Sequence, residues 1–367
     1  MKILLIGDYS NMHSQLARTL RSLGHSVTLL SEGSGFQQTE RDIDVRRKLP
    51  WKFGGLELLL RCKHLFRNKL RNFDIVALQH PHFLALKTHH LKSLLQILRG
   101  ENNRIFLTAA GIDANYIREC LDPASPLAYS EFRIGATPGP VAPSAKRWLT
   151  PEMQEYNDFF YSQIDGAVSA LYEYHVALRR ILPDSRIHYG GIPIDTNALQ
   201  PFPLPDINHG IHLFLGRHSR RKAEKGTDLL EQAAGELYKR HNGNIVLDIV
   251  EDRPYAEYIG MMHNSHIVLD QTYSYTPATN ALIAMARGRI AASGAEPQFY
   301  NFIGETDNQP IVNVGPTLNN TIEALDNIIS NPDDIQRRAN ASRNFVIKHN
   351  AAEVVAARFL AAFTSQP

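Results

Sequence analysis

The sequence predicts an α/β protein built from two doubly wound, Rossmann-like domains that face each other across a cleft. With 367 residues, the chain is long enough for two domains that each have a sizeable core. In both halves short apolar runs alternate with helical patterns, which is typical of parallel strands joined by crossover helices. Between the halves lies a stretch with four prolines and little periodicity, residues 193–210, which indicates a linker.

We therefore expect four segments along the chain. Ligands of doubly wound sheets bind at the carboxyl ends of strands, so the loops after the apolar runs are the places to search for a site. The four segments are an N-terminal domain of residues 1–193, a linker of residues 194–210, a C-terminal domain of residues 211–345 and a C-terminal helix of residues 346–367.

The predicted elements follow in order. The first half opens with a strand at residues 3–6, a helix at residues 11–23 and a strand at residues 27–30. Further strands are predicted at residues 75–78, 105–108, 167–170 and 187–189. In the second half, strands are predicted at residues 211–215, 245–250, 267–270, 290–292 and 311–314, with helices near residues 227–240, 255–262 and 277–287. The tail over residues 333–363 indicates two helices.

Composition excludes several classes of protein. Lys and Arg (39) nearly balance Asp and Glu (37), so the net charge of +2 argues against nucleic acid as a partner. The two cysteines, Cys62 and Cys120, fit a reducing compartment and cannot form a four-ligand metal site alone. No run reaches the roughly 18 apolar residues of a membrane span, and the first run is too short for a signal peptide. We expect a cytoplasmic protein.

The loop after the first apolar run lies where a dinucleotide-binding fingerprint would need three glycines. Tyr9 and Met12 occupy the second and third of these positions, which argues against a nicotinamide or flavin dehydrogenase. We predict that Gly7, Asp8 and His13 line the cleft. The alternative is an ordinary tight turn at Gly7 and a structural role for His13.

Five basic side chains follow the first strand of the predicted C-terminal domain. Arginine can bind a phosphate through two hydrogen bonds and lysine supplies a point charge, so fixed cations at the end of a strand suit a phosphate group. The alternative is a solvated charged face. The five residues are Arg217, Arg220, Arg221, Lys222 and Lys225.

A second element for phosphate is predicted near residues 275–281, where Thr276 is the candidate N-cap and Pro277 the first helical residue. A helix N-terminus offers unpaired N–H groups and the positive end of the helix dipole. Many structural helices also begin with Thr-Pro, so this pattern alone is not specific for a ligand.

Three motifs of the second half lead to a resemblance: Gly216-Arg217, Lys225-Gly226, and Leu-Ile-Ala-Met-Ala-Arg-Gly at residues 282–288. They resemble motifs in the C-terminal domain of GT-B fold glycosyltransferases, family-4-like (glycosyl transferases group 1). Residues 1–30 and 190–195 resemble the opening βαβ unit and the interdomain stretch of the same family.

The resemblance implies transfer of a sugar from a nucleotide-sugar donor to a glycan or a lipid-linked acceptor. In that family an arginine and a lysine contact the donor diphosphate, which implies Arg217 together with Lys222 or Lys225. Spacing from the arginine favours Lys222, and the Lys-Gly pair favours Lys225. We expect no resident cofactor and no metal, because the cations can neutralise the leaving diphosphate.

One motif of the family is degenerate in this chain. The family's Glu-x7-Glu pair falls on Tyr275 and Ile283, so both carboxylates are missing. Either Thr279, Asn280 or Glu296 contacts the donor ribose in place of the second glutamate, or donor binding is weakened or altered. The rival hypothesis is a non-catalytic nucleotide-sugar-binding or assembly protein with the same fold.

On the acceptor side, residues 109–113 resemble the family's strand-end turn, and Asp113 supplies its carboxylate. Such a carboxylate could accept the proton of the acceptor hydroxyl or orient it, which would make Asp113 catalytic. The alternative is an N-cap for the helix that follows. Asp42 and Asp44 have the Asp-x-Asp spacing of a metal site, but no apolar strand precedes them, so no metal site is predicted.

Residues 46–72 form a strongly basic segment. The segment holds nine basic residues against Glu57 alone, which is a net charge of +8 in a chain of +2. Leucine and aromatic residues are interleaved with the charges, as in helices that lie on a membrane surface. We predict that this segment binds the anionic inner face of a membrane and presents the acceptor. The alternative is a packed crossover helix with a solvated basic face.

Overall fold

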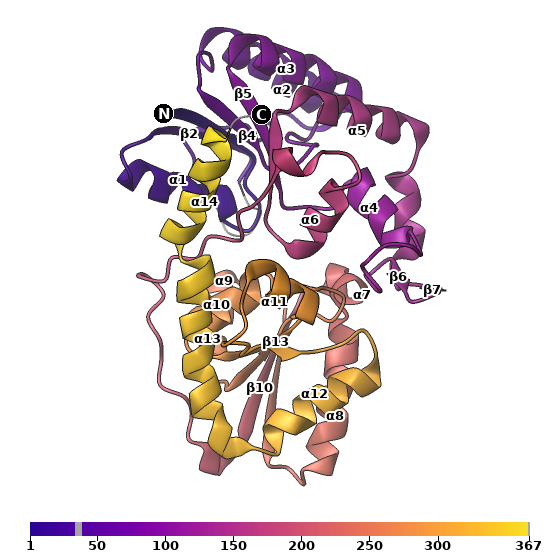
Figure 1. Cartoon of the computed structure of the whole chain (residues 1–367), viewed down its shortest axis with the longest axis vertical. Coiled ribbons are helices and arrows are strands. Elements are labelled where there is room, and N and C mark those ends of the chain that lie inside the picture. Colours follow the sequence, from indigo (N-terminus) through magenta and orange to yellow (C-terminus); the bar gives the residue numbers. More distant parts are fainter. Residues whose placement is uncertain (34–38, 366–367) are drawn as a thin grey trace. The chain divides into compact units, whose positions relative to one another are not determined.

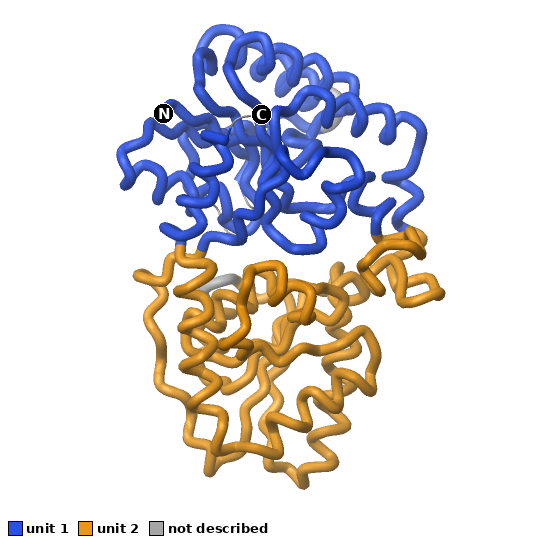
Figure 2. The backbone as a smooth tube through the Cα atoms, in the orientation of Figure 1, with its two compact units in different colours: residues 1–119, 144–193, 352–367 blue, residues 120–143, 194–351 orange. Residues whose placement is uncertain are grey.

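The computed structural model describes residues 1–33 and 39–365 of the chain. The chain forms two compact units, each assembled from separate segments (Figure 2). Unit 1 comprises residues 1–119, 144–193 and 352–367, and unit 2 comprises residues 120–143 and 194–351. The chain therefore passes from one unit to the other four times.

Unit 1 contains a seven-stranded parallel sheet in the order β3-β2-β1-β4-β5-β8-β9. The register aligns Ile6 with Leu30 on one side and with Leu78 on the other. The central strands are apolar runs with no exposed position, as expected for a parallel sheet that helices cover on both faces. The strands are β1 (Lys2–Ile6), β2 (Ser26–Ser31), β3 (Ile43–Asp44), β4 (Ile75–Leu78), β5 (Arg104–Ala109), β8 (Gly166–Ser169) and β9 (Ile187–Tyr189).

Helices cover this sheet in two groups. Helices α2, α3 and α5 pack together, and their residues Leu58, Leu91 and Phe160 share one buried cluster with Val76 and Ile105 of the strands. Helix α1 packs against α14, which the chain adds at its very end (Figure 1). The helices are α1 (Met12–Ser22), α2 (Trp51–Asn68), α3 (Thr88–Glu101), α4 (Ala114–Leu121), α5 (Pro151–Gln163), α6 (Tyr172–Leu178) and α14 (Ala352–Thr364).

Unit 2 contains a five-stranded parallel sheet in the order β11-β10-β12-β13-β14. Leu213, Leu215 and Leu269 of the sheet are buried with Leu230 and Leu325 of the helices. The strands are β10 (Ile211–Arg217), β11 (Ile245–Glu251), β12 (Ile267–Leu269), β13 (Ile290–Ser293) and β14 (Val312–Asn313). The helices are α7 (Lys222–Lys225), α8 (Thr227–Arg240), α9 (Tyr255–Met262), α10 (Thr279–Ala286), α11 (Pro297–Ile303), α12 (Leu318–Ile329) and α13 (Ile335–Asn350).

These sheets confirm the predicted fold class of two doubly wound α/β domains. Each predicted strand is present, with its ends within two residues of the prediction. The segment predicted as a linker, residues 194–210, belongs to unit 2. Its position is fixed because Arg289, which is fully buried, donates hydrogen bonds to the carbonyl oxygens of Phe202 (3.2 Å) and Pro203 (2.9 Å).

Two segments lie in a different unit from the one that sequence order suggests. Residues 120–143, which interrupt unit 1, join unit 2 and carry a short hairpin of β6 (Arg133–Ile134) and β7 (Thr137–Pro138). Helix α14 returns to unit 1, where Phe359 lies so close to Gly190 that a Cβ atom there would be 2.5 Å from the ring. Among the described residues, no helix is both long and apolar enough to cross a membrane.

Candidate functional site

The strand order of unit 2 changes direction between β10 and β12. In doubly wound sheets this topological switch point, at the carboxyl ends of the strands, is where ligands bind. The loop that follows β10 carries the basic residues singled out above, and β12 is followed by Asp270. The basic loop therefore lies at the position in unit 2 where the fold favours a ligand site.

Arg217 is the last residue of β10, and carboxylates hold its side chain. The guanidinium forms ion pairs with Glu231 of α8 and with Glu251 at the end of β11, the latter at 2.7 Å. The preceding residue must be glycine, because a Cβ atom at Gly216 would lie 2.0 Å from the ring of Tyr258. The Gly-Arg motif thus allows the strand to pass beneath Tyr258 and places Arg217 at the edge of the sheet.

The two candidate lysines have different partners. Lys222 binds Glu251 at 2.7 Å, whereas Lys225 binds Asp270 at 3.1 Å and so connects the loop after β10 to the end of β12. The Lys222 ammonium, with Arg217 nearby, lowers the pKa of Glu251. Only Lys225 of these two contacts a residue on the other side of the switch point.

Gly226 explains the Lys-Gly pair. It has a φ of 66°, in the left-handed region, and a Cβ atom there would lie 2.0 Å from Oγ1 of Thr272. The backbone N–H of Thr272 donates to the carbonyl oxygen of Lys225 at 3.0 Å. This close approach fixes the start of α8 against the segment after β12.

Three of these five basic residues, Arg217, Lys222 and Lys225, pair with carboxylates of other elements. Glu251 is shared by two of them, and Glu231 and Asp270 complete the set. A phosphate that binds here must therefore displace carboxylates or share the cations with them. Glu231 and Glu251 could not be assigned to the site from the sequence, because they lie on other elements. Asp270 could have been, because it is a polar residue at the end of a predicted apolar strand.

The predicted helix start near Thr276 needs correction. Helix α10 begins at Thr279, and its N-cap is Ala278, which is extended and contributes no side-chain hydrogen bond. Thr276 lies before the helix and is buried, so the prediction of a Thr276 N-cap was wrong. Thr279 and Asn280 are half-buried in the first turn, where a ligand could meet them.

Tyr275, at the first position of the degenerate motif, is buried. Its ring stacks on Tyr129 with centroids 4.8 Å apart and planes at 26°, and its hydroxyl accepts a hydrogen bond from the N–H of Ala128 at 2.5 Å. Ile283, at the second position, is also buried. In place of the family's carboxylates, unit 2 has a tyrosine that fastens residues 120–143.

Glu296, the third candidate for the ribose contact, also binds the segment of residues 120–143. Its carboxylate accepts hydrogen bonds from the Tyr129 hydroxyl at 2.7 Å and from Nδ2 of Asn313 at 3.1 Å. Tyr129 could not be singled out from the sequence, since the segment around it has neither an apolar run nor a periodic pattern.

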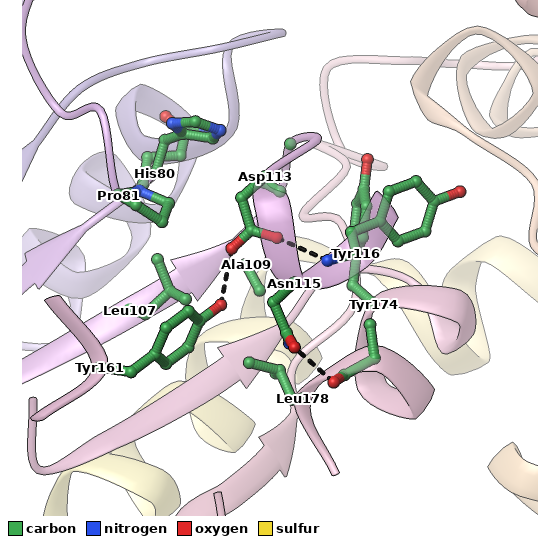
Figure 3. Close-up of a pocket in the computed structure, with 14 residues that line it drawn as sticks. His80, Pro81, Leu107, Ala109, Asp113, Asn115, Tyr116, Tyr161, Tyr174 and Leu178 are labelled. Carbon is green, nitrogen blue, oxygen red and sulfur yellow. Dashed lines mark hydrogen bonds between the residues drawn. The ribbon is translucent and has the colours of Figure 1, made fainter. Parts of the chain in front are cut away.

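In unit 1 a small pocket lies at the carboxyl ends of β4 and β5, and Asp113 lines it (Figure 3). The carboxylate accepts a hydrogen bond from the N–H of Tyr116 at 2.7 Å, and this bond makes Asp113 the N-cap of α4. It accepts a second hydrogen bond from the hydroxyl of Tyr161 at 2.7 Å. Asp113 is only 5% exposed. The capping role that the sequence allowed is therefore present, and the same carboxylate faces the pocket.

His80 fixes the turn that carries Asp113. Its Nδ1 accepts from the N–H of His82 at 2.8 Å, so Nε2 carries the proton and donates to the carbonyl oxygen of Ile112 at 2.8 Å. Burial lowers the pKa of His80. Gly111 is required beside it, because a Cβ atom there would lie 2.8 Å from the imidazole ring.

Asp8 and His13 lie inside unit 1, next to Gly7 at the end of β1. Asp8 accepts hydrogen bonds from the N–H of His13 at 3.0 Å and from the hydroxyl of Ser14 at 2.8 Å, which holds the start of α1. His13 has no exposed surface; its ring nitrogens contact the carbonyl oxygen of Gly7 and the hydroxyl of Thr108. Burial lowers the pKa of His13 to about 4, so the ring is neutral. These contacts hold the first turn of α1 against the ends of β1 and β5.

No group of three or more potential metal ligands occurs in the part of the chain that the structure describes. The Asp-x-Asp pair binds arginines instead. Asp42 forms an ion pair with Arg21 at 2.5 Å, and Asp44 pairs with Arg41 and Arg46, each at 2.7 Å.

No family model and no curated protein sequence matches the chain. Solved structures do match. The HepE protein of Anabaena, in complex with UDP and glucose, has a TM-score of 0.63 and 10% identity over 100% of both chains. Sucrose-phosphate synthase of Thermosynechococcus elongatus has a TM-score of 0.63 and 12% identity, with 99% of this chain and 98% of the other covered.

A third match is UDP-GlcNAc 2-epimerase of Neisseria meningitidis bound to UDP-GlcNAc, with a TM-score of 0.54 and 11% identity over 100% of both chains. The chain has the GT-B fold. The resemblance noted in the sequence motifs is thereby confirmed at the level of the fold. The GT-B fold serves more than one reaction among these proteins, so the activity must be argued from the residues of the two sites.

Proposed function

We propose that this GT-B chain is a glycosyltransferase that moves a sugar from a nucleotide-sugar donor to a glycan or a lipid-linked acceptor. The observation that carries the proposal is the cluster of Arg217, Lys222 and Lys225 at the switch point of unit 2. Fixed cations at this position suit a diphosphate. The shared fold supports the same ligand class, since two of the similar proteins were solved with UDP and with UDP-GlcNAc.

In the proposed mechanism the donor diphosphate takes the place of Glu231 and Glu251 at Arg217 and approaches Lys225 beside Asp270. As the bond between the sugar and the diphosphate breaks, negative charge develops on the leaving group, and the nearby cations stabilise it. The N–H groups in the first turn of α10 add to this stabilisation. Neutralisation by side chains makes a metal unnecessary for this step.

The ribose contact is best assigned to the first turn of α10. Thr279 and Asn280 are half-buried there, whereas the carboxylate of Glu296 already accepts two hydrogen bonds within unit 2. An amide or hydroxyl side chain can exchange hydrogen bonds with a ribose hydroxyl. Asn280 is the stronger candidate because its amide has two N–H donors and a carbonyl acceptor, whereas the hydroxyl of Thr279 has a single donor.

On the acceptor side we propose Asp113 as the catalytic residue. Its two oxygens accept from Tyr116 and Tyr161, which leaves lone pairs for a further donor at the pocket. In the proposed role Asp113 accepts the proton of the acceptor hydroxyl as that oxygen attacks the sugar.

The second candidate function is a non-catalytic nucleotide-sugar-binding or assembly protein. Specific observations favour it: Tyr275 and Ile283 replace both carboxylates of the family motif and are buried. Binding of a nucleotide sugar without turnover would be the result expected from this alternative.

The experiment has two stages. Calorimetric titration with UDP, UDP-glucose and UDP-GlcNAc tests donor binding, and release of UDP in the presence of candidate acceptors then tests transfer. Analysis of the recovered sugar distinguishes transfer from epimerisation at C2. Equal rates of transfer with a chelator and with added manganese are expected, and a rate that depends on manganese would contradict the metal-independent mechanism.

We also propose that the protein acts in the cytoplasm. The sequence contains only two cysteines, Cys62 and Cys120, and such a low cysteine content fits a reducing compartment.

A further inference from the structure

Helix α2 exposes a row of large apolar side chains. Phe53 is 73% exposed, Leu56 55% and Leu60 59%, which makes them the three most exposed large apolar side chains of the residues described. Positions i, i+3 and i+7 lie on one face of a helix. The row is therefore a continuous apolar stripe and not three scattered residues.

The core of unit 1 does not use this stripe. The opposite face of α2 is buried through residues such as Leu58, Cys62 and Phe66, which pack in one cluster with α3 and α5. Figure 1 places α2 beside α3 in the outer helix layer of unit 1. A crossover helix that only packs on its sheet would have polar side chains at the three outer positions, so the stripe needs another explanation.

Basic side chains continue the stripe toward the end of the helix. Lys63 and Arg67 follow Leu60 at spacings of three and seven, so they lie on the same face, and Lys69 comes directly after the helix. In the part of the chain that the structure describes, these three cations have no ion pair with a carboxylate, and the single acid of α2, Glu57, is paired with Arg61.

Further basic groups lie next to Lys63. The pKa of His90 on α3 is lowered by partial burial and then by the neighbouring His89, Lys63 and Lys87. The charged groups that act on His90 are therefore all basic, while the acids nearest to this part of α2, Glu57 and Glu32, act on Cys62 on its buried face. An apolar stripe bordered by uncompensated cations is complementary to one kind of surface, an anionic lipid bilayer.

We propose that the outer face of α2 docks unit 1 onto an anionic membrane, with Phe53, Leu56 and Leu60 inserted among the lipid headgroups. Lys63, Arg67 and Lys69 then bind the lipid phosphates. The vesicle binding itself does not depend on the proposed function; only the consequence that a lipid-linked acceptor would be held near unit 1 rests on it.

The test is co-sedimentation of the full chain with vesicles of phosphatidylglycerol and phosphatidylcholine, at about 0.02 M and about 0.5 M salt. Phe53→Ser, Leu56→Ser and Leu60→Ser together should abolish the binding that remains at high salt, because the apolar contribution is not screened. Lys63→Gln, Arg67→Gln and Lys69→Gln together should weaken binding at low salt on the order of a hundredfold, at about fivefold for each cation.

Matched controls come from unit 2 and from the loop before α5. Tyr238→Ser, Ile249→Ser and Met261→Ser remove three other exposed apolar side chains and should leave vesicle binding unchanged. The control for charge replaces three other exposed cations by glutamine, namely Lys146, Lys239 and Arg253. All substituted side chains are at least partly exposed, so circular dichroism should show native folding in each variant.

Three results would overturn the proposal. One is wild-type protein that stays in the supernatant with anionic vesicles at low salt. Another is a triple serine variant that binds as the wild type does. The last is a dimer in solution that the triple serine variant converts to a monomer, because the stripe would then belong to a second copy of the chain.

Discussion

Tyr275 stacks on Tyr129 with their ring centroids 4.8 Å apart. Tyr275 occupies the position where the resembling family has a carboxylate, and Tyr129 belongs to the segment of residues 120–143 that interrupts unit 1. The hydroxyl of Tyr129 also reaches Glu296. Tyr275 and Glu296 together therefore hold residues 120–143 within unit 2.

The first prediction concerns this attachment. Tyr129→Phe removes the hydrogen bond to Glu296 and leaves a carboxylate oxygen less satisfied, which should lower the free energy of unfolding of unit 2 by about 1–3 kcal/mol. Hydrogen exchange within residues 120–143 should accelerate in the variant. Tyr238→Phe, on an exposed tyrosine, is the control. Unchanged exchange in Tyr129→Phe would show that the stacking and the hydrogen bond from Ala128 to Tyr275 hold the segment without the Tyr129 hydroxyl.

The second prediction concerns Arg217. Arg217→Ala should weaken UDP binding by about 1.5–3 kcal/mol, the usual contribution of a hydrogen bond to a charged group. Titration calorimetry measures the change. Arg220→Ala removes the same charge from an exposed position of the same loop and should alter the affinity little, because exposed ion pairs contribute about 0–1 kcal/mol. Equal affinity of Arg217→Ala and wild type would exclude this donor site.

The third prediction tests the competition between carboxylate and phosphate. Glu231→Gln removes one of the acids that bind Arg217 and so reduces the repulsion of an incoming diphosphate. UDP binding should become tighter by about two- to fivefold, a modest effect because the pair is partly exposed. Glu236→Gln, at an exposed position of α8, serves as the control. Weaker binding by Glu231→Gln would mean that Glu231 positions Arg217 and does not compete with the ligand.

The fourth prediction separates the two roles of Asp113. Asparagine caps a helix about as well as aspartate, so Asp113→Asn should keep the N-cap of α4 and lower the free energy of unfolding by only about 1 kcal/mol. Loss of a catalytic carboxylate should instead lower kcat by about 10²- to 10⁴-fold, with little change in the KM of the donor. A variant with full activity would leave Asp113 with the capping role alone.

The fifth prediction concerns pH. Burial lowers the pKa of His13 to about 4, against about 6.5 in the unfolded chain. Below pH 6.5 the unfolded chain takes up the proton first, so His13 destabilises the fold progressively as the pH falls toward 4, by about 3 kcal/mol at most. Above pH 6.5 the effect vanishes, since both states are neutral.

Urea titrations between pH 7 and pH 4 measure this dependence. In His13→Asn the loss of stability over that interval should be smaller than in the wild type, whatever the absolute stability of the variant. His209→Asn, at a side chain that is 79% exposed, should keep the slope of the wild type. Identical slopes in all three proteins would contradict a neutral buried His13.

The strands could be predicted because nearly all of their residues are apolar and pack in the core. The run Ile75–Leu78 is buried at every position, so composition alone marks it as a central strand. The hairpin Arg133–Pro138 could not be predicted, since its strands have two residues each. The residues just before it, Ala128 and Tyr129, bind Tyr275 and Glu296 far along the chain. Contacts between residues so far apart in the chain cannot be inferred from the local sequence.

The basic residues of the candidate site could be predicted from the sequence, but the carboxylates that pair with them could not. Arg217, Lys222 and Lys225 follow one strand, which the sequence shows directly. Their carboxylates come from α8, β11 and the end of β12, and only the folded sheet brings these elements together. For the same reason, the hydrogen bonds from Arg289 to residues 202 and 203 could not be predicted from local sequence.

The discontinuity of the two units has a consequence for synthesis and for dissection of the protein. Phe359 of α14 packs against Gly190, so unit 1 can complete its core only after residue 359 has left the ribosome. A fragment that ends at residue 193 lacks α14, and a fragment that begins at residue 194 lacks the 120–143 segment that Tyr275 and Glu296 bind. Neither half is a self-sufficient folding unit, and separate expression of the two should yield aggregation-prone chains that recover solubility only when they are made together.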